Sequence, residues 1–353
     1  MVNNSPESDR LQSRLLLLAA VFLFFFALIL TLSPAVRARS WQVDYRWDHW
    51  LGFLVWGILI VLTHRQSVRW LPGRDPYLLP IASLLSGWGV LTIWRLNPPF
   101  GLRQTIWLAV CLVIFMVGLR LPNDLNFLRR YKYLWLTTGL LLTSLTLIFG
   151  TNPSGGGLPR LWLGCCGVYF QPSEPLKLLL VVYLAAYLAS KPNPGVGNAP
   201  LLPLLAPTLI MACLALLLLV VQRDLGTASI FLFLYALVVY IASGRKRILL
   251  AAVSGLVIAG VAGYGLFDVV RLRMEAWLNP WLDASGRSYQ IVQSLLAVAN
   301  GALFGRGPGL GSPTLVPIPH SDFIFVAIAE EFGLFGVVGL ILLLALLVSR
   351  GLR

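Results

Sequence analysis

Residues 14–32 read RLLLLAAVFLFFFALILTL and decide the fold class of the chain. A helix needs about 20 predominantly apolar residues to cross the hydrocarbon core of a bilayer. This run holds one charged residue, Arg14, at its very start. It is long, has no small-residue cleavage site and is followed by many similar runs, unlike a cleavable signal peptide. We therefore expect a membrane-spanning helix here.

Similar apolar runs recur along the rest of the chain. They fall near 50–63, 77–94, 104–119, 133–149, 174–189, 203–221, 225–243, 248–268 and 323–349. Hydrophobic residues make up 58% of the chain and charged residues only 12%, against about 45–50% and about 25% in a soluble domain. These proportions exclude a soluble globular protein. The sequence predicts an all-α polytopic membrane protein with about ten transmembrane helices.

The chain carries a formal net charge of +13. In a membrane protein this surplus indicates loops that face anionic lipid rather than a nucleic-acid partner. Lys and Arg are denser on the short segments that would lie on the same side as the N-terminus, Lys191 among them, than on the segments of the opposite side. By the positive-inside rule, both termini are expected in the cytoplasm.

Two of the predicted outer loops, about 150–173 and about 269–322, are too long to be simple connectors. Loops of this length are usually functional when they are not disordered. The apolar stretch Ile291–Leu303 argues against disorder in the second loop, because its apolar residues recur at helical spacing. We expect a helix there that lies on the membrane surface or re-enters the membrane.

Ionisable residues within a span are functional hypotheses by default. Glu174 and Lys177 stand at the start of a span, three residues apart, so they share a helix face and can form an ion pair. Ser173 is the expected cap of that helix. Two interpretations stay open: a self-neutralised helix end at the membrane interface, or a substrate-binding pair.

A second polar group borders the last apolar run. His320, Ser321 and Asp322 precede the run, and Ser321 and Asp322 are candidate helix caps. Glu330 and Glu331 follow about two turns into the span. Surrounding hydrocarbon would leave two adjacent carboxylates unpaired or protonated, so we expect a cationic partner, either Lys177 or an arginine.

Asp283 lies in the second outer loop amid Trp277, Trp281 and Tyr289. A carboxylate that is partly desolvated by aromatic rings, yet open to the outer face, can accept a proton from an incoming hydroxyl group. The alternative interpretation is an aspartate that closes a loop turn.

The other polar and sulfur-containing residues have structural interpretations. Asp224 ends a short turn between two spans and is the expected cap of the next helix. Cys111 and Cys213 lie in apolar runs, and Cys165 and Cys166 are adjacent without the spacing of a metal site, so all are expected to be packing residues. The sequence contains no Ser-His-Asp arrangement, phosphate-binding P-loop or metal-binding cluster.

Five motifs follow one another in a recognisable order. They are Leu161-Trp-Leu-Gly164; Phe170-Gln-Pro-Ser-Glu-Pro-Leu-Lys177; Asp224-Leu-Gly-Thr227; Asn279-Pro-Trp-Leu-Asp283 with Tyr289-Gln290 and Gln293-Ser294; and His320-Ser-Asp-Phe-Ile-Phe325 with Ala329-Glu-Glu331. This set resembles the SEDS family, the FtsW, RodA and SpoVE proteins of bacterial division, elongation and sporulation. The resemblance covers roughly 77–349. Any single motif is weak, but five in the same order are specific.

The resemblance implies a peptidoglycan glycosyltransferase that polymerises lipid II at the outer face of the bacterial cytoplasmic membrane during division or elongation. The implied partners are lipid II, a class B penicillin-binding transpeptidase and other divisome or elongasome membrane proteins, with no nucleic acid. No cofactor is implied with certainty; a divalent cation, Mg²⁺ or Mn²⁺, is a candidate for holding the pyrophosphate of the substrate.

The resemblance also implies roles for particular residues. The aspartate proposed as catalytic in the family aligns with Asp283, and the tryptophan needed for activity falls at Trp162. The glutamate and the lysine of the second motif fall at Glu174 and Lys177. The other candidates for binding the substrate are Arg160, His320, Asp322, Glu330 and Glu331.

The chain departs from the family pattern at both ends. Residues 1–76 form an N-terminal extension with two extra spans, ahead of a core at 77–353 that includes the outer loop 269–322. The family's last two spans, with their Pro-Leu-Pro and Ser-Tyr-Gly-Gly segment, have no counterpart before Arg353, so we expect a core that is incomplete at its C-terminal end. Two alternative functions stay open: a lipid II flippase, and a non-catalytic scaffold that recruits the transpeptidase.

Overall fold

The chain is mostly α-helical and divides into two compact units. The computed structural model describes residues 6–121, 126–152, 160–165, 168–190 and 201–352. The first unit comprises Met1–Leu121 and Leu272–Arg353, and the second comprises Pro122–Arg271. The predicted outer loop 150–173 is therefore described only in part, and Cys166 and Lys191 lie outside the described residues.

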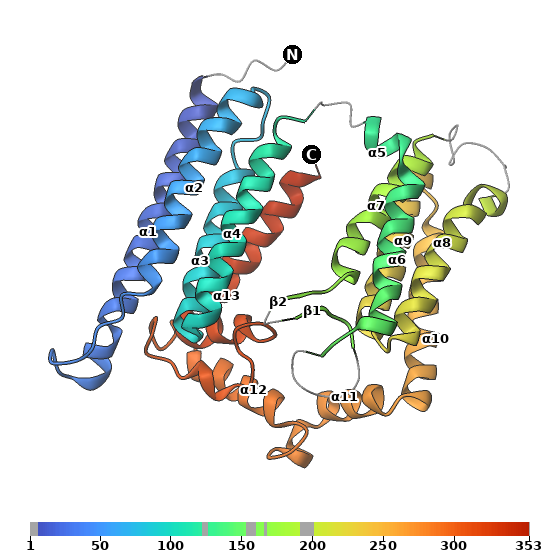
Figure 1. Cartoon of the computed structure of the whole chain (residues 1–353). Helices are drawn as coiled ribbons and strands as arrows, with labels where there is room; N and C mark the ends of the chain where they lie inside the picture. Colours follow the sequence, from blue (N-terminus) through green and yellow to red (C-terminus); the bar gives the residue numbers. More distant parts are fainter. Residues whose placement is uncertain (1–5, 122–125, 153–159, 166–167, 191–200, 353) are drawn as a thin grey trace. The chain divides into compact units, whose positions relative to one another are not determined.

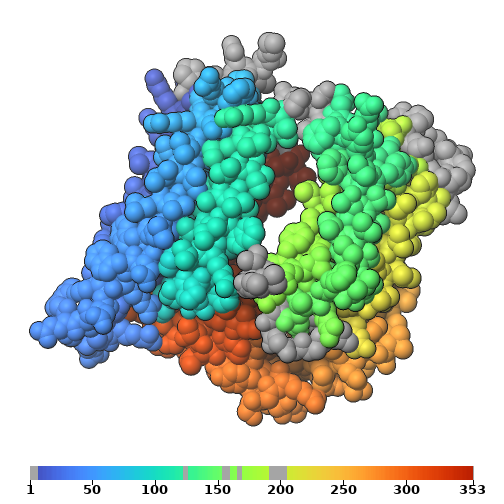
Figure 2. Space-filling model, viewed as in Figure 1, coloured from blue at the N-terminus to red at the C-terminus, as the bar shows by residue number. Residues whose placement is uncertain are grey.

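The first unit is a bundle of long helices with a loop-rich segment at one end (Figure 1). Its elements are α1 (Pro6–Ala38), α2 (His49–Trp70), α3 (Leu78–Leu96), α4 (Pro98–Gly118), the 3-10 helix η1 (Pro280–Asp283), α12 (Tyr289–Gly301), the 3-10 helix η2 (Pro313–Leu315) and α13 (Ile324–Gly351). Helix α3 contacts α1, α2, α4 and α13, so it is the central helix of this unit. Helices α2 and α4 lie side by side in the space-filling view (Figure 2).

Large apolar side chains form the core of the first unit. Trp56 of α2 and Trp88 of α3 are buried with Leu30 of α1 and Ile328 of α13. The indole Nε1 of Trp56 donates to the Ser83 carbonyl at 2.9 Å, so this polar group is satisfied inside the apolar core. The two N-terminal helices therefore share a core with α3 and α13. The division of the chain into a 1–76 extension and a 77–353 core stays a prediction.

The second unit is a separate helical bundle with one small hairpin (Figure 1). Its elements are α5 (Asn126–Arg130), α6 (Lys132–Phe149), β1 (Leu163–Cys165), β2 (Val168–Phe170), α7 (Ser173–Leu188), α8 (Leu201–Val221), α9 (Leu225–Ser243) and α10 (Lys246–Leu266). Strands β1 and β2 pair antiparallel, with Leu163 opposite Phe170. Helix α11 (Asp268–Leu278) begins in this unit and ends in the first.

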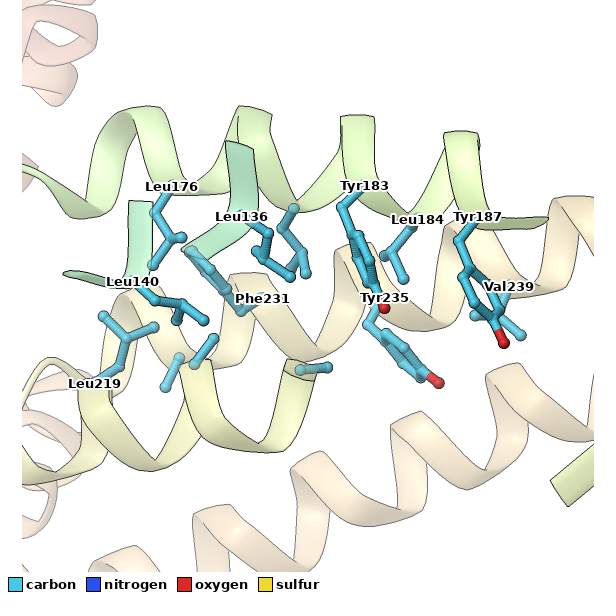
Figure 3. Packing of buried hydrophobic residues seen from close by; sticks show 14 of the residues in the cluster. Leu136, Leu140, Leu176, Tyr183, Leu184, Tyr187, Leu219, Phe231, Tyr235 and Val239 are labelled. Carbon is cyan, nitrogen blue, oxygen red and sulfur yellow. The ribbon is translucent and has the colours of Figure 1, made fainter. Parts of the chain in front are cut away.

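Helix α7 is the centre of the second unit. Leu176, Leu180 and Tyr183 of α7 are fully buried. They pack in one cluster with Leu136 of α6 and Phe231 of α9 (Figure 3). The first turn of α7 carries Glu174 and Lys177, so this packing fixes where that turn lies within the unit.

Every apolar run predicted from the sequence corresponds to one helix, with ends that agree to within two residues where the run extends past the helix. Among the residues that the structure describes, eight helices are long and apolar enough to cross a membrane: α1, α2, α3, α4, α6, α9, α10 and α13. Helix α8 adds a shorter apolar stretch, Leu205–Val221, and α7 has 16 residues. Apolar side chains such as Ile114 and Val257 are exposed on these helices, as expected of side chains that face lipid. The predicted fold class, an all-α multi-pass membrane protein, is confirmed.

Candidate functional site

Asp283 is the last residue of the 3-10 helix η1, between α11 and α12. Its carboxylate Oδ2 accepts a hydrogen bond from the backbone N–H of Arg287 at 3.0 Å. Its carbonyl oxygen accepts from the N–H groups of Gly286 and Ser288, each at 3.2 Å. The alternative predicted from the sequence, an aspartate that closes a turn, therefore describes the local structure correctly.

The turn leaves the Asp283 carboxylate partly available. Asp283 is exposed, and its Oδ1 accepts no hydrogen bond from the residues that the structure describes. Gly286 permits this arrangement, because a Cβ at that position would collide with the Asp283 carboxylate. A carboxylate that is oriented through one oxygen and free at the other has the geometry of a proton acceptor.

Large apolar side chains that lie near Asp283 in the sequence are exposed. Trp277 is 73% exposed, Trp281 is 58% exposed and Leu282 is 81% exposed. Exposed aromatic and aliphatic side chains of this size are typical of a membrane–water interface or a binding surface. The predicted helix in 291–303 is present as α12, which packs on α13; its position relative to the membrane stays a prediction.

Glu174 and Lys177 form the predicted ion pair in the first turn of α7. Lys177 Nζ lies 2.8 Å from Glu174 Oε1, and the lysine side chain is the less exposed of the two. The predicted cap by Ser173 is wrong: the residue before the helix is Pro172, no side chain caps the helix, and Ser173 is buried. Gln171 Nε2 donates to Ser173 Oγ at 3.0 Å instead.

Trp162 lies in an isolated backbone bridge immediately before β1. The N–H of Thr151 donates to the Trp162 carbonyl at 2.8 Å, and the N–H of Trp162 donates back at 3.3 Å. The tryptophan is half-buried, whereas Arg160, two residues earlier, is exposed. The bridge fixes the backbone of Trp162 beside the end of α6.

The turn that contains Gln222 and Asp224 is structural. Asp224 caps α9 by accepting a hydrogen bond from the N–H of Thr227 at 3.1 Å, as predicted. Gln222 is buried, and its Nε2 donates to the Thr143 carbonyl and to Thr146 Oγ1, both at 2.8 Å. These bonds tie the end of α8 to α6.

Helix α13 is interrupted at Gly333, just after Glu330 and Glu331. Gly333 has φ 67° and ψ −165°, a conformation that is essentially restricted to glycine. The break frees backbone groups within a membrane span, where each needs a partner. The N–H groups of Leu334 and Phe335 donate to the carbonyls of Ala302 and Leu303, at 3.0 and 3.2 Å.

The glycine-rich segment 305–311 completes this arrangement from the other side of the break. The N–H groups of Arg306 and Gly307 donate to the carbonyls of Glu330 and Glu331, at 2.9 and 3.0 Å. The N–H of Ser312 donates to Glu330 Oε1 at 3.0 Å. The loop therefore replaces the helical hydrogen bonds that α13 loses at its break.

Arg95, near the end of α3, is the cationic partner of the buried carboxylates. Its Nε lies 3.3 Å from Glu331 Oε1, and both side chains are almost fully buried. Its Nη2 donates to the carbonyls of Gly309 and Gly311, each at 3.1 Å. The expectation of an arginine partner is thus confirmed. Sequence reasoning did not single out Arg95, although an arginine at the end of an apolar run was the available signal.

Neither Ser321 nor Asp322 caps α13. The residue before α13 is Phe323, and no side chain caps that helix, so the predicted cap by Ser321 or Asp322 is wrong. The His320 ring stacks on Phe100 at the start of α4, with a centroid distance of 4.4 Å. Asp322 is exposed.

The candidate residues fall into two groups, one in each unit. Arg160, Trp162, Glu174 and Lys177 belong to the second unit, and Asp283, His320, Asp322, Glu330 and Glu331 belong to the first. Within the first unit, Asp283 and His320 have separate partners, Arg287 and Phe100. In the part of the chain that the structure describes, no three His, Cys, Asp or Glu residues gather as metal ligands would.

Comparison with known proteins identifies the family. The family model of the FtsW, RodA and SpoVE proteins, described as "Cell cycle protein", matches residues 90–353. The peptidoglycan glycosyltransferase RodA of Mycobacterium tuberculosis is 31% identical, over 99% of this chain and 77% of the relative. The probable peptidoglycan glycosyltransferase FtsW of Escherichia coli O157:H7 is 34% identical, over 72% of this chain and 61% of the relative.

The fold is also similar to that of a solved protein. A chain from a structure titled "Structural coordination of polymerization and crosslinking by a peptidoglycan synthase complex" aligns with a TM-score of 0.50 and 26% identity. The alignment covers 85% of this chain and 76% of the solved chain. The family model covers well over half of the residues, and all five ordered motifs lie within it. The chain therefore belongs to the SEDS family, that of the FtsW, RodA and SpoVE cell cycle proteins.

Proposed function

We propose that the chain is a peptidoglycan glycosyltransferase of the bacterial cytoplasmic membrane that polymerises lipid II at the outer face. Family membership and the glycosyltransferases among its relatives support this proposal. The observation that carries it is the Asp283 carboxylate, which is oriented by Arg287 through one oxygen and exposed to solvent.

In the proposed reaction, Asp283 is the general base. The hydroxyl oxygen of the acceptor sugar forms a new bond to the anomeric carbon of the growing glycan. The bond from that carbon to the pyrophosphate oxygen breaks, and the pyrophosphate leaves with the bonding electrons. The hydroxyl proton passes to Asp283. Proton transfer to a placed base contributes about 10²–10⁴-fold to the rate.

The surroundings of Asp283 suit a substrate that carries a lipid. The exposed side chains of Trp277 and Leu282 would lie in the interfacial layer of the bilayer, where aromatic and aliphatic groups are stable. A polyprenyl-linked sugar presents its head group in that layer. The same segment can therefore anchor the loop and meet the reacting sugar.

The pyrophosphate needs cationic contacts, and Lys177 and Arg160 are the proposed ones. Lys177 is neutralised by Glu174 at 2.8 Å, so a bound pyrophosphate would compete with that carboxylate for the ammonium group. Trp162, His320 and Asp322 are proposed as further substrate contacts. Glu330 and Glu331 instead support the segment 305–312, because Arg95 and the N–H of Ser312 hold them.

The proposed partners are a class B penicillin-binding transpeptidase and other membrane proteins of division or elongation. The solved protein similar to this chain comes from a peptidoglycan synthase complex, which supports a partner of this kind. Both termini are proposed to be cytoplasmic, an orientation that would put the Asp283 loop on the outer side. A divalent cation stays a prediction. The described residues offer no cluster of ligands for it, so no step above uses one.

The flippase alternative gains little support from the buried carboxylates. A translocation path would use Glu174, Lys177, Glu330 and Glu331 as lining groups. In the structure, however, Lys177 pairs with Glu174, Arg95 pairs with Glu331, and Ser312 donates to Glu330. The scaffold alternative predicts that the chain forms no glycan polymer from lipid II, whereas the proposed enzyme does form it.

The test is the Asp283→Asn variant of the full chain, reconstituted in vesicles with its transpeptidase partner and labelled lipid II. We expect the rate of glycan formation to fall by about 10²-fold or more, because the amide cannot take up the proton. The matched control is Asp268→Asn, which removes a carboxylate at the start of α11 whose side chain is 85% exposed. The control should polymerise lipid II at the normal rate.

Two results would contradict the proposal. Normal polymerisation by Asp283→Asn would exclude this residue as the base. Movement of the lipid II head group across the vesicle membrane without polymer, in the unmodified chain, would favour the flippase.

A further inference from the structure

Two neighbouring cavities lie in the first unit where α1 ends and α2 begins. One has a volume of about 360 Å³, and its lining includes Arg37, Arg46, Asp48, Arg95 and Thr314. The other, of about 350 Å³, shares Arg37 and Arg46 and extends to Gly309. Each is within the size range of about 300–1,000 Å³ that is typical of small-ligand sites. Neither contains a residue assigned above to glycosyl transfer.

Three arginines from three segments line the larger cavity. Arg37 comes from the end of α1, Arg46 from the loop before α2, and Arg95 from the end of α3. Arg95 forms an ion pair with Glu331 and donates hydrogen bonds to the carbonyls of Gly309 and Gly311. This anchoring gives the site one rigid, almost fully buried cation.

The other two arginines have few partners. Arg37 Nη2 donates to the neutral hydroxyl Ser312 Oγ at 2.8 Å. Arg46 forms no hydrogen bond and no ion pair with any of the described residues. Asp44 lies on the wall of the smaller cavity and Asp48 on the wall of the larger one, but among the described residues no ion pair within 4.0 Å joins either to any of the three arginines. The cluster therefore has guanidinium donors to spare.

The electrostatic environment of Arg46 also favours a bound anion. Partial desolvation, together with the positive charges of Arg95 and Arg37, lowers the pKa of Arg46, and the opposing effect of Glu331 is smaller. Like charges held this close repel each other, and a bound anion would relieve that repulsion.

We propose that the larger cavity, lined by Arg37, Arg46 and Arg95, together with its neighbour that shares Arg37 and Arg46, binds a phosphate group. Guanidinium groups match phosphate oxygens in geometry and donate to them in pairs, and donors that converge from separate segments suit an anion with several equivalent oxygens. The Thr314 hydroxyl provides a further donor on the wall. Two sources carry this chemistry: the head group of an anionic phospholipid, and inorganic phosphate or diphosphate in solution. The site does not depend on the proposed glycosyl transfer.

The test compares variants of the full chain in a maltoside detergent, which contains no phosphate. Binding of inorganic diphosphate is measured by titration calorimetry, and retention of phosphatidylglycerol by native mass spectrometry. We expect Arg46→Gln to weaken binding by about tenfold or more, since a hydrogen bond to a charged group is lost. Arg46→Lys should be intermediate, because it keeps the charge but loses the paired donors.

The matched control is Arg39→Gln, an exposed arginine of the same segment that lines neither cavity. It should bind both probes as the unmodified chain does. Because Arg46 has no hydrogen bond or ion pair with the described residues, thermal unfolding of the Arg46→Gln variant should match that of the control. Binding of either probe that depends on Arg46 supports the site and identifies the source of the phosphate. If neither probe binds, or if Arg46→Gln and Arg39→Gln bind alike, the assignment is wrong.

Discussion

At the scale of single residues, Arg95 has two functions that only the folded chain reveals. It pairs with Glu331 in the interior of the first unit, and it holds the carbonyls of Gly309 and Gly311. A buried ion pair is weak evidence of net stabilisation by itself. Removal of one partner is different, because the other charge is left buried and uncompensated.

Replacement of Arg95 should therefore be strongly destabilising. We expect Arg95→Gln to cost about 3–5 kcal/mol of unfolding free energy, because the Glu331 carboxylate would lose its counter-charge. Unfolding of the purified chain in detergent, followed by heat or denaturant, measures the change. The control is Arg103→Gln, whose exposed guanidinium lies over the Phe100 ring at the surface. Equal midpoints for the two variants would show that the buried pair contributes nothing.

At the scale of elements, the break in α13 is the feature that positions the glycine-rich segment. A continuous helix would satisfy its own carbonyls, and the N–H groups of Arg306 and Gly307 would have no acceptors in Glu330 and Glu331. Discontinuous helices are tolerated in membranes where protein groups replace the missing bonds. The interruption and the segment 305–311 are therefore parts of one arrangement.

The Gly333→Ala variant tests this coupling. An alanine at φ 67° and ψ −165° would be strained, and its methyl group would collide with the backbone of Leu303 and Gly305. We expect the unfolding free energy to fall by about 1–3 kcal/mol from the strain alone. Gly339→Ala in the same helix is the matched control, because a Cβ there meets open space. That control should be neutral or slightly stabilising, given the higher helix propensity of alanine. Similar unfolding of the two variants would mean that Gly333 can adopt an ordinary helical conformation.

At the scale of the whole molecule, the orientation in the membrane is the open topological question. With both termini in the cytoplasm, the loop after α1 lies outside and the loop after α2 lies inside. In a variant without the four native cysteines, Arg39→Cys should react with an impermeant maleimide on intact cells, and Gly73→Cys should react only after permeabilisation. Both positions are exposed, so accessibility within the fold does not decide the result. The reverse pattern of labelling would place the Asp283 loop on the cytoplasmic side.

Much of this fold is readable from the sequence because spans are local. A run such as 14–32 needs no distant partner to be recognised, and the i,i+3 spacing of Glu174 and Lys177 predicts their ion pair directly. The cap by Asp224 is equally local. The interruption at Gly333 and the choice of Arg95 as the partner of Glu331 depend on residues far apart in the chain, and nothing in the local pattern selects them.

The candidate site shows the same limit. Asp283 was identifiable by its aromatic neighbours and by the family motif, yet the hydrogen bond from Arg287 that orients it depends on the turn the loop adopts. Ser173 and Asp322 had the right residue type for caps. They are not caps, because α7 begins at Ser173 itself and Phe323 lies between Asp322 and α13. A shift of one residue in a helix start is enough to remove a cap.

The division of the first unit into two segments has a consequence for the order of synthesis. The second unit is one continuous stretch, Pro122–Arg271, so all of its helices can meet as soon as they leave the ribosome. Helices α1–α4 are made earlier, but α13, which packs against α3 and supplies Glu331 to Arg95, is made after the whole second unit. Until α13 is made, Arg95 has no Glu331 to neutralise its charge. The helices that are inserted first are thus the last to acquire all of their packing partners.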